Sequence, residues 1–259
     1  VSPDLNIVSM FNDNKITSYV QKSNHLIFGI EYDLLRNLSF NLEVYYKTMS
    51  NMANANKDKL FADDKEHESK PEYLRKEYII ENGNAYGGAV SLKYDNGRLY
   101  VWAIYSLGKV TKENEIFTYA PHYDRRHNVN ILCNYQFGMD RSFELSLRWN
   151  YGSGFPFTPT ASMMEYVDWS DGMSTDWINQ NGTLTTIYGD LNSKRLPDYH
   201  RFDISAKKRF DIGKRSILEI DLSVTNVYNR NNLFYVNRIT SERVDQLPIM
   251  PSLGVSCTF

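Results

Sequence analysis

The sequence predicts an all-β fold, an antiparallel transmembrane β-barrel. Three observations lead to this fold class. Segment after segment alternates apolar and polar residues with a period of two, as a strand with one apolar and one polar face does. Short and long connections between these segments alternate along the chain without exception. Aromatic residues are abundant, with 19 Tyr, 13 Phe and 4 Trp, although the mean hydropathy is only −0.50.

The alternation predicts nine strands. The segments LSFNLEVYYK and SFELSLRWNY each set apolar and aromatic residues on one face and polar residues on the other. About ten residues at 3.3 Å each, tilted by about 45°, cover roughly 23 Å, which is close to the apolar band of a transmembrane barrel. The predicted strands are 23–33, 38–47, 85–95, 98–107, 127–137, 142–151, 201–210, 215–228 and 250–259.

The connections indicate how the two ends of the sheet differ. Short turns follow the first, third, fifth and seventh strands, and Asn96-Gly97 is a strong hairpin signal among them. Long loops follow the other strands, at about 48–84, 108–126, 152–200 and 229–249, and residues 1–22 are interpreted as the remnant of a further loop. Outer-membrane barrels have this arrangement, with short periplasmic turns and long extracellular loops. Aromatic rings near the strand ends would then form the two interfacial girdles.

The global composition excludes several classes of protein. A formal net charge of −2 leaves no electrostatic footprint for nucleic acid. Cys133 and Cys257 are the only cysteines, so the chain has no disulfide framework and no zinc-type cluster, and we expect neither a metal nor a cofactor. The longest apolar run, at 99–108, is far shorter than the roughly 20 residues of a membrane-spanning helix.

The odd number of strands indicates an incomplete wall. Bacterial single-chain barrels close with an even number of strands, and both of their termini lie in the periplasm. Nine strands would start this chain on the long-loop side and end it on the short-turn side. We therefore expect the C-terminal part of a larger barrel. The alternatives are a strand missed within residues 1–20 and a second chain that completes the wall.

The order of seven motifs resembles the C-terminal half of the barrel of a TonB-dependent outer-membrane receptor. The motifs cover the chain from about Ser23 and are EYDLLRNLSFNLEVYYK, NGNAYGGAVSLKYDNGRLYVWAIYSLGK, PHYDRRHNVNILCNYQFG, LSLRWNYGSGFPFTP, LPDYHRFDISAKKRF, LSVTNVYNRNNLFY and LPIMPSLGVSCTF. Such receptors are 22-stranded plugged barrels, so the nine strands would be the last nine.

The resemblance implies a function and a set of partners. It implies residence in the bacterial outer membrane, in contact with its lipid. It also implies active import of a scarce small ligand, such as a siderophore, vitamin, glycan or peptide. The energy would come from the TonB complex through a plug domain that lies outside this chain.

No pattern in the sequence predicts catalysis or a metal site. In NYGSGFPFTPT, at 150–160, Ser153 follows a glycine, but Tyr151 stands where a nucleophile elbow requires glycine, and no lysine and helix follow as in a phosphate-binding loop. The stretch is interpreted as a strand end, where Pro156 and Pro159 stop further pairing. His122 and His127 lack zinc-site spacing and are interpreted, together with DYHRFD at 198–203, as residues of the barrel rim.

Polar residues that point into the lumen are the first group of candidate ligand contacts. Asp95 and Arg98 are predicted to lie opposite each other beside the Asn96-Gly97 turn as an ion pair. If Asp95 faces inward, then Tyr100 and Trp102 do so as well. The same parity adds Glu43, Lys93, Glu144, Arg148, Asp203, Lys207, Glu219 and Asp221. Most of these side chains are expected to bond to each other or to the plug.

The longest loop supplies the second group of candidates. It interleaves Tyr166, Trp169 and Trp177 with Asp168, and aromatic platforms among hydrogen-bonding groups suit sugars or aromatic chelates. Any exposed protein-binding loop can look similar. The resemblance implies that ligand contacts come mainly from such loops and from the plug. The candidate contacts are Trp169, Trp177, Tyr166, Asp168, Arg148, Trp102 and Tyr100.

The last residues of the chain form a separate signal. Leu253, Val255, Cys257 and Phe259 alternate on the outward face, and the chain ends on an aromatic residue. This pattern resembles the C-terminal signal by which the barrel-assembly machinery recognises outer-membrane proteins. The machinery is therefore an expected partner during biogenesis, and an ordinary edge strand is the alternative.

Three functions remain open, and the import receptor is favoured. An outer-membrane barrel enzyme, such as a lipase or protease, needs a nucleophile and a base on one face, and no serine and histidine are paired in that way. A secreted all-β binding or adhesive protein would be soluble without detergent, which separates it from the other two.

Overall fold

The computed structural model describes residues 11–12, 15–16, 20–55, 62–63, 65–70, 75–114, 116–166, 183–212, 216–237, 240 and 242–259. These residues are almost entirely strands and their connections, with a short 3-10 helix, η1, at Lys65–His67. Within these ranges, no helix combines the length and the hydropathy that a membrane span requires.

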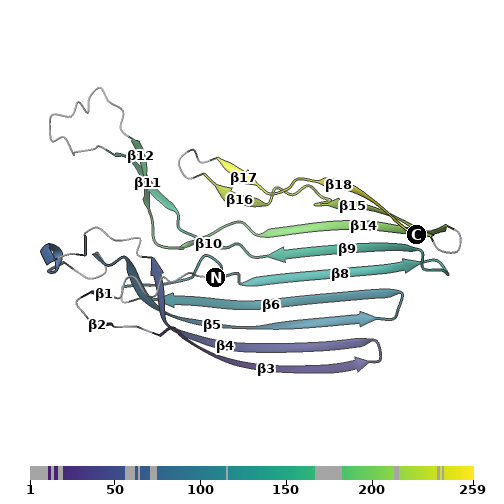
Figure 1. Cartoon of the computed structure of the whole chain (residues 1–259), viewed down its shortest axis with the longest axis horizontal. Helices are drawn as coiled ribbons and strands as arrows, with labels where there is room; N and C mark the ends of the chain where they lie inside the picture. The colour runs from purple at the N-terminus through teal and green to yellow at the C-terminus, as the bar shows by residue number, and fades with distance from the viewer. Residues whose placement is uncertain are drawn as a thin grey trace.

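Nine long strands form one antiparallel sheet (Figure 1). Each strand pairs with the next one along the chain, in the order β3-β4-β5-β6-β8-β9-β14-β15-β18, and the two-residue β7 (Thr118–Tyr119) adds to β6. All nine strands that the alternation predicts are therefore present. Their bounds are β3 Lys22–Leu35, β4 Leu38–Ala55, β5 Tyr78–Asp95, β6 Leu99–Glu113, β8 His127–Phe137, β9 Phe143–Gly152, β14 Tyr199–Ile212, β15 Ser216–Thr225 and β18 Met250–Thr258.

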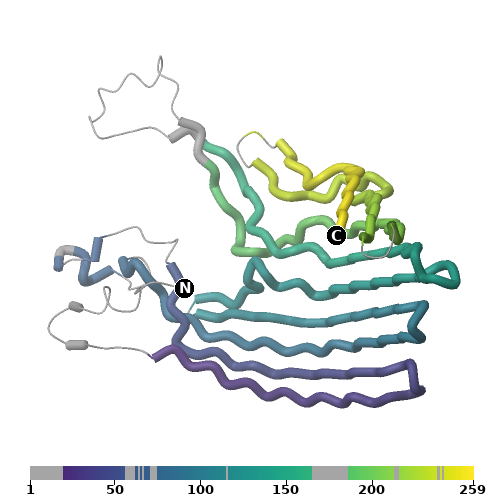
Figure 2. The backbone as a smooth tube through the Cα atoms, turned by 45° about the vertical axis from the view of Figure 1, so that its right-hand side comes forward, coloured from purple at the N-terminus to yellow at the C-terminus, as the bar shows by residue number. Residues whose placement is uncertain are grey.

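The short and long connections lie at opposite ends of the sheet, as their order in the sequence predicts (Figure 1). Small hairpins fill the long-loop end: β11 (Thr160–Tyr166) pairs with β12 (Thr183–Tyr188), and β16 (Leu233–Val236) pairs with β17 (Arg243–Asp245). Near the N-terminus, β1 (Phe11–Asn12) pairs with β2 (Lys15–Ile16) rather than with the main sheet. Figure 2 shows that the sheet curls along its width from β3 to β18, and these two strands are its open edges among the described residues.

Two details differ from the expectations. β4 and β5 run to Ala55 and from Tyr78, further than the alternation indicates, because a bulge between Met49 and Met52 interrupts the period of two. In the β5–β6 hairpin, Asp95 lies opposite Tyr100 rather than Arg98, so the predicted Asp95–Arg98 pairing is wrong. The cause is the Asn96 side chain, whose Oδ1 accepts hydrogen bonds from the backbone N–H groups of Arg98 and Leu99, at 3.0 and 2.8 Å.

The strand registers give the sheet one polar and one apolar face. Residues that lie opposite each other on neighbouring strands share a face of the sheet. Lys93 lies opposite Trp102, and Arg148 lies opposite Asp203, and such pairings continue from strand to strand across the sheet. The predicted parity is confirmed in the six strands that carry the named residues, β4, β5, β6, β9, β14 and β15. The residues that it places together on the polar face are Glu43, Lys93, Tyr100, Trp102, Glu144, Arg148, Asp203, Lys207, Glu219 and Asp221.

The apolar face has no protein layer against it. Among the described residues, none of the apolar side chains on this face of the nine strands is buried, and Leu26 is 72% and Leu253 66% exposed. The sheet therefore buries its apolar side chains against something other than itself, as the lipid-facing wall of a barrel does.

Aromatic side chains mark both ends of the apolar face. Near the long loops, Tyr46 lies opposite Tyr86, and Tyr151 lies opposite His200. Near the short turns, Tyr32 lies opposite Phe40, and Phe137 lies opposite Phe143. Two such bands are the girdles of an outer-membrane wall, where each ring is half in lipid and half in water.

Candidate functional site

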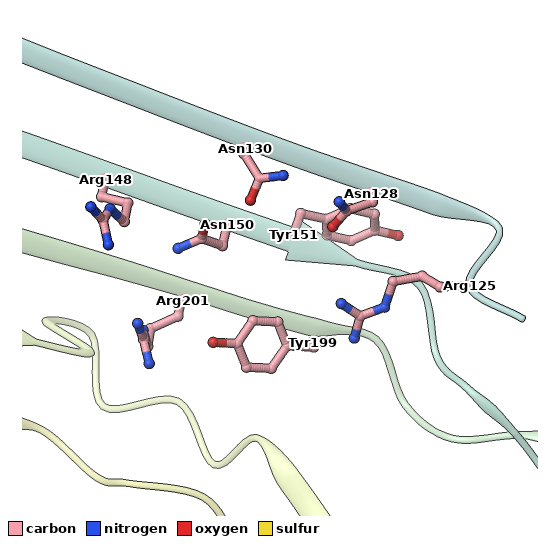
Figure 3. Close-up of a pocket in the computed structure, with 8 residues that line it drawn as sticks. All are labelled: Arg125, Asn128, Asn130, Arg148, Asn150, Tyr151, Tyr199 and Arg201. Carbon is pink, nitrogen blue, oxygen red and sulfur yellow. The ribbon is translucent and has the colours of Figure 1, made fainter. Parts of the chain in front are cut away.

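The polar face is hollowed where β8, β9 and β14 lie side by side (Figure 3). The hollow has a volume of about 290 Å³. Arginine, asparagine and tyrosine residues form its walls, and no carboxylate is among them. They are Arg125, Asn128, Asn130, Arg148, Asn150, Tyr199 and Arg201, together with Tyr151, which the register places on the apolar face of β9.

The registers of the three strands bring these residues together. Asn130 of β8 lies opposite Asn150 of β9, which lies opposite Arg201 of β14. One row nearer to the loops, Asn128 and Tyr199 flank Gly152. Since alternate residues of a strand share a face, the two rows point the same way and combine into one polar floor.

Arg125 closes the hollow at the loop end. Its guanidinium carbon lies 4.3 Å from the centre of the Phe155 ring and 5.8 Å from that of Tyr199, and such contacts with aromatic faces are favourable for a cation. Its buried Nε atom has no hydrogen-bond partner. Burial lowers the pKa of Arg125, although nearby Tyr199 acts in the opposite direction. An arginine nevertheless stays charged at any physiological pH.

Two glycines of the NYGSGFPFTPT stretch allow close approach at this point. A Cβ atom on Gly152 would lie 2.5 Å from Nη1 of Arg125, and one on Gly154 would overlap the main-chain carbonyl group of Leu196. The hydroxyl of Ser153, between them, accepts a hydrogen bond from the backbone N–H of His127 at 3.0 Å. The chain does leave the main sheet here, but β10 (Pro156–Phe157) pairs with β13 (Lys194–Arg195), so the prolines do not end all pairing.

The charge of the hollow is not balanced by the described acids. Arg201 forms an ion pair with Asp203 at 3.0 Å. Arg125 and Arg148 form no ion pair with any described residue, although Asp203 lies opposite Arg148 in the register. The hollow therefore carries a net positive charge and many N–H donors, an arrangement that suits oxygen acceptors.

Asp124, beside Arg125, belongs to a different cluster. It is 1% exposed, and it accepts hydrogen bonds from the Val110 backbone N–H at 2.8 Å, Arg126 Nε at 2.9 Å and Arg195 Nη2 at 2.5 Å. Burial raises the pKa of Asp124, but these three donors outweigh it and hold the pKa below its usual value. Arg195 also donates to the carbonyl oxygen of Gly154 at 3.0 Å, so Asp124 and Arg195 join two long loops above the hollow.

Of the predicted ligand contacts, the structure places Arg148 in the hollow and two others away from it. Tyr100 and Trp102 share the polar face, but Lys93 covers the Tyr100 ring at 5.7 Å, and Trp102 donates to Ser91 Oγ at 2.9 Å. Asp168, Trp169 and Trp177 lie outside the described residues. Tyr166 ends β11, and its side chain also lies outside them.

Sequence reasoning missed Arg125. The residue stands in the connection before β8, where a strand-parity argument assigns no face. The sequence offered two separate signals, the basic pair of DRRH at 124–127 and the aromatic FPF at 155–157, and no local pattern brings the two segments together.

Two of the rim histidines contact tyrosine hydroxyls. Nδ1 of His127 lies 2.9 Å from the Tyr105 hydroxyl, and Nδ1 of His200 lies 2.7 Å from the Tyr228 hydroxyl. In the part of the chain that the structure describes, no group of three His, Cys, Asp or Glu residues is placed to hold a metal ion.

The C-terminal residues lie on the apolar face of the last strand. Leu253, Val255 and Cys257 lie opposite Leu222, Ile220 and Leu218 of β15, in that order. Phe259 is 91% exposed just after the strand. The outward alternation is present as predicted, and the role of these residues in assembly stays a prediction.

One apolar face, one polar face and segregated loops are the features of the wall of an outer-membrane barrel. No protein-family model and no curated protein matches the sequence. Solved structures do match the fold. The pyoverdine outer-membrane receptor FpvA of Pseudomonas aeruginosa PAO1 matches 97% of this chain with a TM-score of 0.61 and 13% identity. The ferric-catecholate import receptor Fiu of Escherichia coli K12 matches 95% with a TM-score of 0.57 and 14% identity.

The chain corresponds to less than a third of these proteins, since it covers 32% of the FpvA chain and 29% of the Fiu chain. It has the fold of part of the barrel of TonB-dependent outer-membrane receptors. The shared fold supports localisation in the bacterial outer membrane. Both solved proteins are named as receptors.

Proposed function

We propose that this chain forms part of the wall of a TonB-dependent outer-membrane receptor that imports a scarce small ligand. The hollow on the polar face is the observation that carries the proposal. It lies at the long-loop end of the sheet, below two loops that Asp124 and Arg195 hold together, and arginine and asparagine donors line it. A wall that only closed a membrane would need no such cluster of uncompensated guanidinium groups.

The comparisons support an import function without identifying the cargo. FpvA was solved with pyoverdine and Fiu is named for ferric-catecholate import, so siderophores belong among the first ligands to test. Vitamins, glycans and peptides are the other classes. The partners in this proposal are outer-membrane lipid on the apolar face, the barrel-assembly machinery at the C-terminal strand, and the TonB complex through a plug domain outside this chain.

Uptake by intact cells tests the proposal. The complete receptor is produced in Escherichia coli with and without tonB, and cells are given ⁵⁵Fe-loaded pyoverdine, a ⁵⁵Fe-loaded catecholate, cyanocobalamin, a maltooligosaccharide or a labelled tripeptide. We expect one class to accumulate only in tonB-positive cells. Photo-crosslinking of the receptor to TonB, enhanced by that ligand, is the second expected result. Recovery of the intact protein from the medium, soluble without detergent, would instead favour a secreted binding protein.

A further inference from the structure

We propose that the hollow between Arg125 and Arg148 binds a ligand through oxyanion groups, carboxylate or phosphate. This inference concerns the cargo of the import receptor and therefore depends on the proposed function. It narrows that cargo to anionic molecules, and it assigns Arg125, which strand parity does not place, as the main contact.

The state of Arg125 is the first observation behind this inference. Its guanidinium carbon lies 4.3 Å from the Phe155 ring centre and 5.8 Å from that of Tyr199, beside a glycine that leaves room for it, and its buried Nε has no partner among the described residues. Desolvating a cation without a counter-charge is costly, and a structure tolerates the cost where a ligand supplies the missing charge. The aromatic contacts fix the plane of the guanidinium, as two-pronged binding of a carboxylate or phosphate requires.

The distribution of charge along the hollow is the second observation. Arg148 lies four residues before Gly152 on β9, so the two arginine positions are separated by about 13 Å along the strand. Figure 3 shows Arg125 and Arg148 at opposite ends of the lining, with Asn130 and Asn150 between them. A matching ligand carries an oxyanion at one or both ends and neutral hydrogen-bonding groups in between.

Neighbouring acids do not neutralise these two arginines. Three described carboxylates lie around the hollow. Asp203 pairs with Arg201, and Asp124 pairs with Arg126 and Arg195. Asp198 accepts hydrogen bonds from the Tyr151 hydroxyl at 2.8 Å and from the Gly154 backbone N–H at 3.1 Å. None of these three carboxylates forms an ion pair with Arg125 or Arg148, so an anion in the hollow meets two guanidinium groups that have no described counter-ion.

Calorimetry on the complete receptor, purified from the outer membrane in detergent, tests the site. The probes are citrate, inorganic pyrophosphate and the neutral sugar maltose, at low ionic strength because salt screens such contacts. We expect citrate or pyrophosphate to bind and maltose not to bind. The better of the two anions shows whether carboxylate or phosphate is preferred.

The variants are Arg125→Gln and Arg148→Gln, with Arg98→Gln as the matched control. Arg98 stands in the exposed turn at the opposite end of the sheet, so the control removes the same charge far from the hollow. Loss of one charged contact should weaken anion binding by about tenfold or more. The Arg98 variant should bind as the wild type does. Arg125→Lys should bind with intermediate affinity, because it keeps the charge and loses the planar fork.

Three results would overturn the inference: a wild-type receptor that binds neither anion, a double Arg125 and Arg148 variant that binds as well as the wild type, or equal loss in the control. Heat-modifiable mobility on a gel confirms that each variant is folded. If the receptor binds an anion but imports no probe, the result supports the proposed anion site and refutes the proposed import function. If the receptor binds no anion, and its Arg125 and Arg148 variants import a neutral cargo normally, the result supports the proposed import function and refutes the proposed anion site.

Discussion

The guanidinium of Arg125 occupies the space beside Gly152 that a side chain would need, with Nη1 placed 2.5 Å from where a Cβ atom would be. The DRRH segment at 124–127 and the end of β9, which are distant in sequence, therefore pack closely against each other. The fit positions a cation at the loop end of the hollow.

Alanine at the two glycines should separate site geometry from folding. Gly152→Ala meets only the movable end of Arg125, so we expect normal assembly and anion binding reduced by about tenfold. Gly154→Ala collides with the Leu196 main chain, which cannot move without breaking the β10–β13 pairing, so we expect a clear loss of folded receptor. Gel mobility and calorimetry measure the two effects. Normal folding of Gly154→Ala would contradict the close approach.

The link between the two long loops should resist mild acid. A carboxylate whose folded pKa is lowered contributes stability that is present above its unfolded pKa of about 3.9 and is lost as the pH falls through the folded value. Hydrogen exchange of the backbone near Asp124, corrected for intrinsic rates, should therefore show constant protection from about pH 7 to 5 and loss below about pH 4.

Asp124→Asn supplies the control for this pH dependence. In this variant, the free energy of protection against hydrogen exchange should already be lower at neutral pH, by about 1–3 kcal/mol. The loss is limited to this size because the partner arginines are about one-third exposed and solvent weakens the ion pairs. A wild-type transition between pH 7 and 5 would assign the effect to another group.

The buried carboxylate of Glu81 and the ammonium group of Lys112 should contribute to stability as a coupled ion pair. Glu81 is 1% exposed and lies 3.1 Å from Lys112 Nζ, and it also accepts a hydrogen bond from the Tyr119 hydroxyl at 2.8 Å. Lys112→Met should cost about 3–5 kcal/mol by leaving a buried charge without its counter-ion. Adding Glu81→Gln should recover part of that loss, as urea unfolding in lipid vesicles would show. A double variant no more stable than Lys112→Met would exclude the coupling.

Charge on the two faces should have opposite consequences. Leu147 lies mid-strand on the apolar face, opposite Cys133 and Ile204, whereas Ser146 lies on the polar face, opposite Asn134 and Ser205. Leu147→Arg should cost about 2–4 kcal/mol in lipid, and Ser146→Arg should be tolerated. Yield in the outer-membrane fraction measures both, and equal tolerance would refute the lipid-facing assignment.

Removal of Phe259 tests the C-terminal assembly signal. The pairing of β18 with β15 ends at Thr258, and Leu253, Val255 and Cys257 lie within it. Deletion of Phe259 therefore leaves the strand pairing intact. We expect fewer receptors in the outer membrane and more in the periplasm, with Phe259→Tyr as a control that keeps the ring. An unchanged outer-membrane yield would favour an ordinary edge strand.

The strands were predictable because their pattern is local. Alternation with a period of two reports which face each residue occupies, and this held for all the named polar-face residues, from Glu43 of β4 to Asp221 of β15. It failed where the period itself was interrupted, at the bulge of β4. It also misplaced the β5–β6 turn by one residue, since the side chain of Asn96 rather than the turn backbone decides which pair closes the hairpin.

The sequence by itself determined the fold class, the two faces and the separation of short turns from long loops, because each follows from contacts between near neighbours. Only the tertiary structure decided the site. Arg125 reaches Tyr199, and Asp124 reaches Arg195, across connections of more than 70 residues. Such contacts depend on strand order and register together, so no local pattern distinguishes the uncommitted Arg125 from its paired neighbour Arg126.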